Sequence, residues 1–147
     1  MQYIVQRAGR KHLPVCSAMG CKLWPHHSEE DMRIEFERIL KSRRDAAFVC
    51  LHDGQAMGFV TVSMRVDYVQ SSTTSPVGYL EGLFVEKPHR RGGAGALLVA
   101  TAEDWARSRG ATEMGSDAYA SNLTSRRFHQ AVGFQVTRPL THFIKKI

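Results

Sequence analysis

The sequence predicts an α/β (α+β) fold in a single domain, residues 1–147, built as a mixed sheet flanked by helices. Three observations support this class. Segments with the apolar spacing of strands alternate with segments of helical spacing, in the order β-α-α-β-β-β-α-β-α-β-β. A hairpin signal, Asp53-Gly54, joins two of the strands. A length of 147 residues with 43% hydrophobic content suits one globular core.

The N-terminal half is predicted to hold two helices and a hairpin. Ser28 stands three residues before Asp31, which is the spacing of a capping box. The apolar residues that follow recur at helical intervals: Met32, Phe36, Ile39 and Leu40. The elements expected here are a strand over 3–5, a helix over 11–23, the helix after Ser28, and strands over 46–51 and 56–64.

The C-terminal half continues with a polar loop over residues 69–76, rich in Ser and Thr. Gly110 is placed to end the long central helix as its C′ residue. The elements expected here are strands over 77–85 and 112–117, helices from 94 to 108 and over 122–131, and a terminal pair of strands over 133–145 broken near Pro139.

The turn between the strand over 77–85 and the next helix has the features of an anion site. It carries two arginines and a glycine cluster: Arg90, Arg91, Gly92, Gly93, Ala94 and Gly95. The first turn of a helix leaves backbone N–H groups without intrahelical partners, and the helix dipole adds positive charge there. Glycines let a ligand approach that backbone closely. The segment therefore predicts phosphate binding, with a tight turn on a basic surface as the alternative.

Two nucleotide fingerprints do not fit this turn. A Walker A loop ends in Gly-Lys-Ser/Thr, whereas Gly95 is followed by Ala-Leu, and the third glycine of a Rossmann fingerprint is replaced by Leu98. The spacing Arg90-x-x-Gly93-x-Gly95 instead resembles the R/Q-x-x-G-x-G/A signature of the GNAT superfamily of acyl-CoA N-acyltransferases. A second segment, from Asn122 to Phe134, resembles that family's N-x-x-A/S-x-x-[apolar]-Y-x-x-x-G-F pattern. The element order also resembles the GNAT fold, so the resemblance covers essentially the whole chain.

Membership would imply a strongly twisted sheet of about seven strands with about four helices, and acetyl-CoA as co-substrate. The backbone of Leu83, Phe84 and Val85 would pair with the pantetheine arm, and the glycine turn would hold the pyrophosphate. Asn122 would approach the pantetheine. His129 occupies the position where the family commonly has Tyr near the thioester sulfur. It would protonate the leaving thiolate or only pack there.

Within the family, four segments resemble the aminoglycoside 6'-N-acetyltransferases: Leu23-Trp24-Pro25, Arg65 to Val69, Ser75 to Gly82, and Gly115-Ser116-Asp117. The resemblance implies an acceptor cleft lined by Trp24, Tyr68, Glu81 and Asp117, with Asp67 as a further acid. Simpler interpretations remain open for four of them. Trp24 would be a core aromatic, Tyr68 a loop anchor, Asp117 a helix cap and Asp67 a solvated loop residue.

Glu81 carries the strongest signal of these residues. It lies in an apolar strand between Leu80 and Leu83, where a carboxylate is unfavourable unless it is paired or functional. An alkylamine is mostly ammonium at pH 7, so an acetyl acceptor must lose a proton before it attacks. Glu81 is expected to act as general base, directly or through a water, while Asp117 orients the ammonium. Purely electrostatic binding by Glu81 is the alternative.

Other classes of function receive less support. The net charge of +6 comes from scattered basic residues without a nucleic-acid motif, so no nucleic-acid partner is expected. The three cysteines lack C-x-x-C spacing, and no metal is expected. No apolar run predicts a membrane span or signal peptide, and we expect a cytoplasmic protein. Another small amine, such as a polyamine or amino sugar, is the alternative acceptor. An acyl-CoA-binding module without turnover is disfavoured by Glu81, Asp117 and Asn122. A homodimer is expected from the resemblance.

Overall fold

The computed structural model describes residues 2–147. The chain divides into two compact units, which meet between Asp117 and Ala118 and are described separately below. The first unit holds the sheet and the first three α-helices, and the second holds the fourth. The prediction of a single domain is not tested by this division and stays a prediction.

The first unit follows the predicted element order closely. Its helices are α1 (Leu13–Leu23), preceded by a 3-10 turn at Arg10–His12, α2 (Glu29–Lys41), and α3 (Ala94–Ser108), preceded by a 3-10 turn at Lys87–His89. Its strands are β1 (Ile4–Arg7), β2 (Asp45–His52), β3 (Gln55–Arg65), β4 (Val77–Val85) and β5 (Met114–Ser116).

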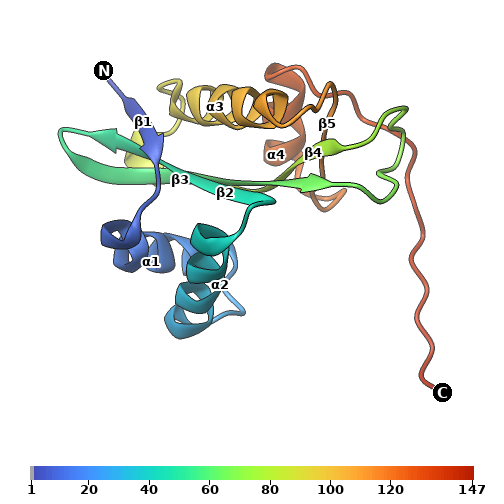
Figure 1. Cartoon of the computed structure of the whole chain (residues 1–147), viewed down its shortest axis with the longest axis horizontal. Coiled ribbons are helices and arrows are strands. Elements are labelled where there is room, and N and C mark those ends of the chain that lie inside the picture. The colour runs from blue at the N-terminus through green and yellow to red at the C-terminus, as the bar shows by residue number, and fades with distance from the viewer. Residues whose placement is uncertain (1) are drawn as a thin grey trace. The chain divides into compact units, whose positions relative to one another are not determined.

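The strands form one mixed sheet in the order β1-β2-β3-β4-β5 (Figure 1). The first four strands pair antiparallel, whereas β5 runs parallel to β4 after the crossover through α3. Parallel neighbours need such a crossover because a tight turn can join only antiparallel strands. The mixed sheet that the sequence predicted is therefore confirmed.

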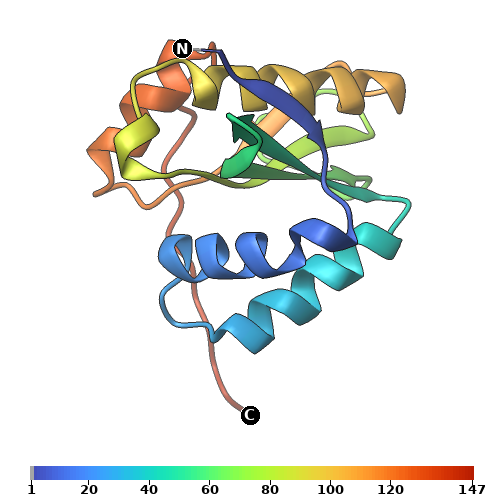
Figure 2. The ribbon, with the colours of Figure 1, turned by 90° about the vertical axis from the view of Figure 1, so that its left-hand side faces the viewer.

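Helices cover both faces of the sheet, with α1 and α2 on one face and α3 on the other (Figure 2). Phe36 of α2 and Phe59 of β3 are almost fully buried on the first face, and their rings meet edge to face at 5.3 Å. On the other face, α3 buries Leu98 and Ala102 completely. Each helix thus presents an apolar stripe to the sheet, which drives the layered packing.

Local signals explain where α2 begins. The Ser28 hydroxyl accepts a hydrogen bond from the backbone N–H of Asp31 at 3.0 Å, and the Asp31 carboxylate accepts one from the Ser28 N–H at 3.1 Å. This reciprocal pair is the predicted capping box, which satisfies two donors that the helix start would otherwise leave unpaired. These hydrogen bonds also lower the pKa of Asp31.

The second unit corrects one prediction. It contains α4 (Leu123–Ala131), but residues 133–145 form no strand, so the described chain has five strands rather than about seven, together with the expected four α-helices. The segment has the apolar residues of a strand, and several are exposed: Val136, Leu140, Phe143 and Ile144. A strand exists only through its ladder with a neighbour. Among residues 2–147, no neighbouring strand pairs with this segment, and apolar spacing alone could not reveal that.

Candidate active site

A bulge in β4 lies at Glu81. Thr61 of β3 is paired with Gly82, and the next residue, Val62, is paired with Leu80, so that Glu81 is left out of the register. A bulge turns a strand and re-aims the side chain of the extra residue. The register shift therefore marks Glu81 as the extra residue of the bulge.

The pairing along the other edge of β4 also changes at this bulge. β5 pairs with β4 over three residues and stops at Leu80, which is paired with Ser116. Beyond the bulge, the stretch from Gly82 to Val85 pairs with β3 alone within the described sheet. Its second edge therefore presents backbone groups that an extended ligand can pair with, as an added strand does.

The Glu81 carboxylate is held by two side chains of β3. Ser63 Oγ donates to Glu81 Oε2 at 2.5 Å. The Arg65 guanidinium grips both oxygens, with Nη2 at 2.9 Å from Oε1 and 3.0 Å from Oε2, and Nε at 3.2 Å from Oε2. The Glu81 side chain remains 34% exposed. The carboxylate in the apolar strand is thus paired, which is one of the two conditions that the sequence required.

The Arg65 guanidinium also lies over the ring of Tyr79, 3.4 Å from its centroid. The Tyr79 hydroxyl in turn donates to Asp117 Oδ2 at 2.5 Å. Burial raises the pKa of Tyr79, and the hydrogen bond to the Asp117 carboxylate raises it further, so the hydroxyl stays a proton donor. A continuous polar network therefore connects the two predicted carboxylates, Glu81 and Asp117.

Sequence reasoning missed Ser63, Arg65 and Tyr79 as members of this network. A signal for two of them exists in β3, where one face reads Thr61, Ser63 and Arg65 while the alternate residues stay apolar. Thr61 and Ser63 are buried despite being polar. A polar row on the buried face of a strand indicates a site rather than core.

Trp24 lies at the end of α1 against the bulge. A Cβ added to Gly82 would collide with the Trp24 ring, so only glycine allows this close approach. The ring also packs against Phe59, at 6.0 Å between centroids, yet Trp24 remains partly exposed. Trp24 therefore lies at the edge of the core and beside the bulge at Glu81.

The loop after β3 carries Asp67 and Tyr68 on the surface. Asp67 is exposed and Tyr68 is 78% exposed, with its hydroxyl accepting the backbone N–H of Ser71 at 2.9 Å. The loop is tethered at its far end by Glu113, whose Oε1 accepts the N–H groups of Thr73 at 2.9 Å and of Thr74 at 2.8 Å. The Thr74 hydroxyl also donates to Oε1, and this hydrogen bond, together with those of the two N–H groups, lowers the pKa of Glu113. Tyr68 is thus a loop anchor with an exposed ring, and Glu113 is a support that the sequence did not reveal.

The glycine turn has the geometry of an anion site. Gly93 is the N-cap of α3 with φ +90°, a left-handed conformation that glycine adopts freely. No side chain caps the helix, and its first intrahelical hydrogen bond runs from the Leu97 N–H to the Gly93 carbonyl. The N–H groups of Ala94, Gly95 and Ala96 therefore point out of the helix start.

Two other residues of the turn have structural partners. Arg90 Nε donates to the Val85 carbonyl at 2.8 Å, which fastens the turn to the end of β4. Gly92 lies against Tyr3, since a Cβ there would come within 2.7 Å of the Tyr3 hydroxyl. Arg91 has φ +66°, unusual for a residue with a side chain, and is exposed. The turn is therefore shaped by Arg90 and the glycines, while Arg91 supplies exposed charge.

The second unit places Asn122 and His129 on α4. Asn122 is the N-cap, and its Oδ1 accepts the N–H of Ser125 at 3.1 Å. His129 Nδ1 lies 2.7 Å from the Ser125 carbonyl, which can only accept, so Nδ1 carries a proton. The His129 ring packs against Phe134 at 5.3 Å. Because Asn122 itself caps α4, the interpretation of Asp117 as that cap is wrong.

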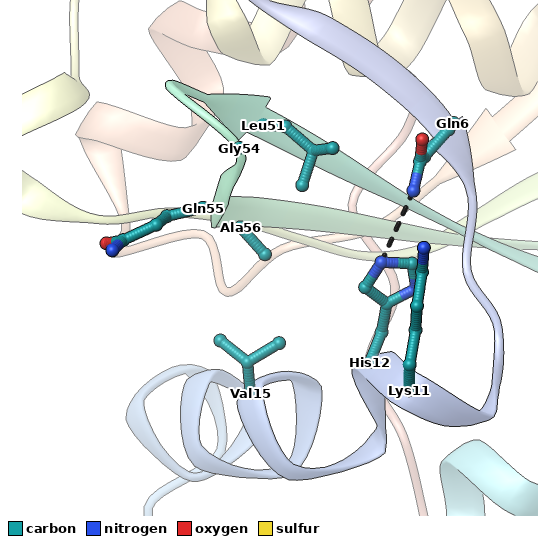
Figure 3. A pocket seen from close by; sticks show the side chains of 8 residues that line it. All are labelled: Gln6, Lys11, His12, Val15, Leu51, Gly54, Gln55 and Ala56. Carbon is teal, nitrogen blue, oxygen red and sulfur yellow. Dashed lines mark hydrogen bonds between the residues drawn. The ribbon is translucent and has the colours of Figure 1, made fainter.

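A separate hollow lies between α1 and the β2–β3 turn, and it contains none of the predicted site residues (Figure 3). His12 is buried there, and its Nδ1 accepts the Gly9 N–H at 2.9 Å. Burial lowers the pKa of His12, and the positive charge of Lys11 lowers it further. Residues 2–147 contain neither a helix suited to spanning a bilayer nor a cluster of three metal-binding side chains.

Comparison with known proteins places this site in a family. The model of the acetyltransferase (GNAT) family matches residues 14–134. The chain is 34% identical over 142 residues to an aminoglycoside N(6')-acetyltransferase type 1 of Salmonella typhimurium, covering 97% of this chain and 98% of the relative. It is 38% identical over 131 residues to that of Serratia marcescens, covering 88% and 90%. A structure of AAC(6')-Iy in complex with the bisubstrate analog CoA-S-monomethyl-acetylneamine matches with a TM-score of 0.95 at 33% identity, covering 100% of both chains.

The chain therefore belongs to the GNAT acetyltransferase family and is an acyltransferase. Within that family it is similar, over nearly its whole length, to the aminoglycoside N(6')-acetyltransferases.

Proposed function

We propose that this chain transfers the acetyl group of acetyl-CoA to the 6'-amine of an aminoglycoside. The observation that carries the proposal is the pair of linked carboxylates, Glu81 and Asp117, at the point where β4 leaves β5. That arrangement combines an ammonium site with an open strand edge. The names of the relatives and the bisubstrate analog bound by AAC(6')-Iy support this acceptor.

The residues of the first unit fit acetyl-CoA. The uncapped start of α3, with its N–H groups beside Arg91, suits a pyrophosphate. The free edge of Leu83, Phe84 and Val85 suits the amides of a pantetheine arm. When bound, acetyl-CoA supplies an acetyl group activated as a thioester. A backbone N–H at this edge, at Leu83 or a neighbour, would polarise its carbonyl oxygen.

The acceptor side needs groups that hold an ammonium and take one of its protons. Oε2 of Glu81 already accepts three donors, whereas Oε1 accepts one and keeps a lone-pair position. Glu81 Oε1 is therefore the atom to which the amine proton passes, and Asp117 orients the ammonium. Trp24, Tyr68 and Asp67 form the remaining walls. Once deprotonated, the amine nitrogen bonds to the acetyl carbon as the carbon–sulfur bond breaks, and the nitrogen releases its second proton to solvent to give the neutral amide.

The leaving sulfur takes up a proton at the end of the reaction. We assign this step to His129, whose imidazole can carry a proton to the sulfur and whose Nδ1 is held by the Ser125 carbonyl. We assign to Asn122 the contact with the pantetheine arm. Both assignments extend the family resemblance to α4.

We further propose a homodimer in the cytoplasm. The extended segment after α4 exposes Phe143 at 91% and Ile144 at 96% of their surface, and a second copy of this chain would cover them and pair their backbone. The free thiols of Cys16, Cys21 and Cys50 suit a reducing compartment. Equilibrium sedimentation with and without residues 136–147 tests the assembly; a dimer that survives the truncation contradicts it.

A thiol-release assay with acetyl-CoA tests the reaction on an amine panel of kanamycin, tobramycin and spermidine. We expect turnover with the two aminoglycosides. Turnover of spermidine alone would support the alternative acceptor, a polyamine, and refute the proposed one.

The same assay tests Glu81. Glu81→Gln keeps the shape of the side chain but cannot accept the proton, so kcat should fall by about 100-fold near pH 7. The matched control is Glu103→Gln, a half-buried residue of α3 outside the proposed site, which should leave kcat unchanged. A Glu81→Gln enzyme with full kcat at every pH would remove Glu81 as the base.

A further inference from the structure

A cation of the protein itself occupies the acceptor site. The Arg65 guanidinium stands between the two predicted carboxylates, paired with Glu81 and stacked on the tyrosine that binds Asp117. Taken together, the formal charges of Glu81, Asp117 and Arg65 sum to −1, although this network contains two acids. An amine that reaches the network therefore meets one unneutralised carboxylate there, in addition to the exposed Asp67 of the neighbouring loop.

The geometry makes this pairing persistent. The fork of Arg65 matches the carboxylate of Glu81, with Nη2 reaching both oxygens and Nε reaching one. Its other side is packed against the Tyr79 ring, where a guanidinium gains a cation–π attraction that lysine's ammonium matches poorly. Ser63, which is buried, holds the same carboxylate from the side. Glu81 is thus fixed in one position by β3.

Asp117 has a different environment. It is exposed, and its Oδ2 accepts a hydrogen bond from the neutral Tyr79 hydroxyl. No cationic side chain within residues 2–147 forms an ion pair with it. The free negative charge of this network is therefore located at Asp117.

We infer that Arg65 is a specificity-determining residue that sets how many ammonium groups the acceptor site favours. By neutralising Glu81, Arg65 leaves an acceptor site that suits one ammonium near the reacting amine. It thereby limits the binding free energy that the further charges of a polycation add. By holding Glu81 in place, it also positions the carboxylate that receives the proton. This inference deepens the proposed function and rests on it.

The test compares a monoamine with a polyamine that present a similar reacting end: 6-amino-6-deoxyglucose and kanamycin. Arg65→Gln and Arg65→Met remove the charge, and Met keeps an apolar stem over Tyr79. Each should raise the kanamycin-to-monoamine ratio of kcat/KM by about three- to tenfold, because one more unpaired charge acts at about 6 Å. The kcat for both acceptors should fall by about tenfold or more as Glu81 loses its fixed position.

Arg65→Lys separates charge from geometry, since it keeps the charge and loses the fork. It should lower kcat but leave the acceptor ratio as in the wild type. Arg10→Gln is the control for overall charge. Arg10 precedes α1 whereas Trp24 follows it, which places Arg10 about 20 Å from the acceptor site by helix length. This control should change neither kcat nor the ratio.

Binding without turnover provides a second measurement. Calorimetric titration of kanamycin should show weaker binding to Glu81→Gln, where Arg65 is left unpaired, and tighter binding to Arg65→Met. The inference is overturned if Arg65→Gln and Arg65→Met fold but leave the kanamycin-to-monoamine ratio of kcat/KM unchanged. It is also overturned if the affinities for kanamycin stay unchanged. A wild-type enzyme that releases no thiol with any amine would instead refute the proposed function.

Discussion

Gly82→Ala tests the contact between Trp24 and the β4 bulge. The added Cβ would overlap the Trp24 ring, which packs on Phe59 and cannot move without disturbing the core of that face. Inserting a methyl group into a packed contact of this kind costs about 1–3 kcal/mol. For a chain of 147 residues, an unfolding entropy of about 2.1 cal/mol/K per residue converts this to a fall in Tm of about 3–10 °C.

The assay is thermal unfolding beside acceptor kinetics. We expect the lower Tm together with a raised KM for the acceptor, because Trp24 is displaced from its place beside Glu81, while affinity for CoA at the glycine turn is unchanged. Gly9→Ala is the matched control, since Gly9 has an ordinary φ of −125° and nothing lies within 4 Å of an added Cβ. Shortening Trp24 to Leu in the Gly82→Ala background should recover part of the lost Tm. If Gly82→Ala matches Gly9→Ala in Tm and in KM, the close packing inferred at the bulge is refuted.

Three further predictions follow from the turn, the loop and the hollow. Gly93→Ala forces a side chain into φ +90°, which should destabilise the fold by about 1–2 kcal/mol. It should also weaken CoA binding measured by calorimetry, and an unchanged CoA affinity would contradict pyrophosphate binding at the glycine turn. Glu113→Gln should speed amide hydrogen exchange at Thr73 and Thr74, because a neutral amide accepts their N–H groups more weakly; unaltered exchange would show that the tether is dispensable. The pKa of His12 lies below its ordinary 6.5 in the fold, so the unfolded chain binds its proton more readily and stability should fall as pH drops below about 6.5. Denaturant unfolding between pH 7.5 and 5 measures this, and a His12→Gln variant should lose that part of the pH dependence.

Much of the fold could be predicted because its elements have strong local signals. The helix after Ser28 begins at its capping box, and the β2–β3 turn lies at the predicted hairpin signal. The terminal strands over 133–145 could not be decided in the same way. Their apolar residues suit a strand, but pairing depends on a neighbour elsewhere in space, and no local pattern reveals that neighbour.

The same distinction between local signals and spatial partners applies to the candidate site. Glu81 and the glycine turn were recognisable, since a carboxylate in an apolar strand and a glycine-rich helix start are local anomalies with chemical meaning. The partners of Glu81 were not recognisable. Ser63 and Arg65 lie 18 and 16 residues away along the chain, and they reach Glu81 only because the register of β3 on β4 shifts at the bulge.

The sequence by itself determined the family, the order of its elements, and which carboxylate and which turn deserved a chemical role. These are properties of short segments, where spacing and side-chain chemistry are sufficient. Only the tertiary structure decided that Glu81 is paired with Arg65 while Asp117 accepts a hydrogen bond from the Tyr79 hydroxyl. A charge acts on whatever lies within a few ångströms, and folding alone determines which residues those are.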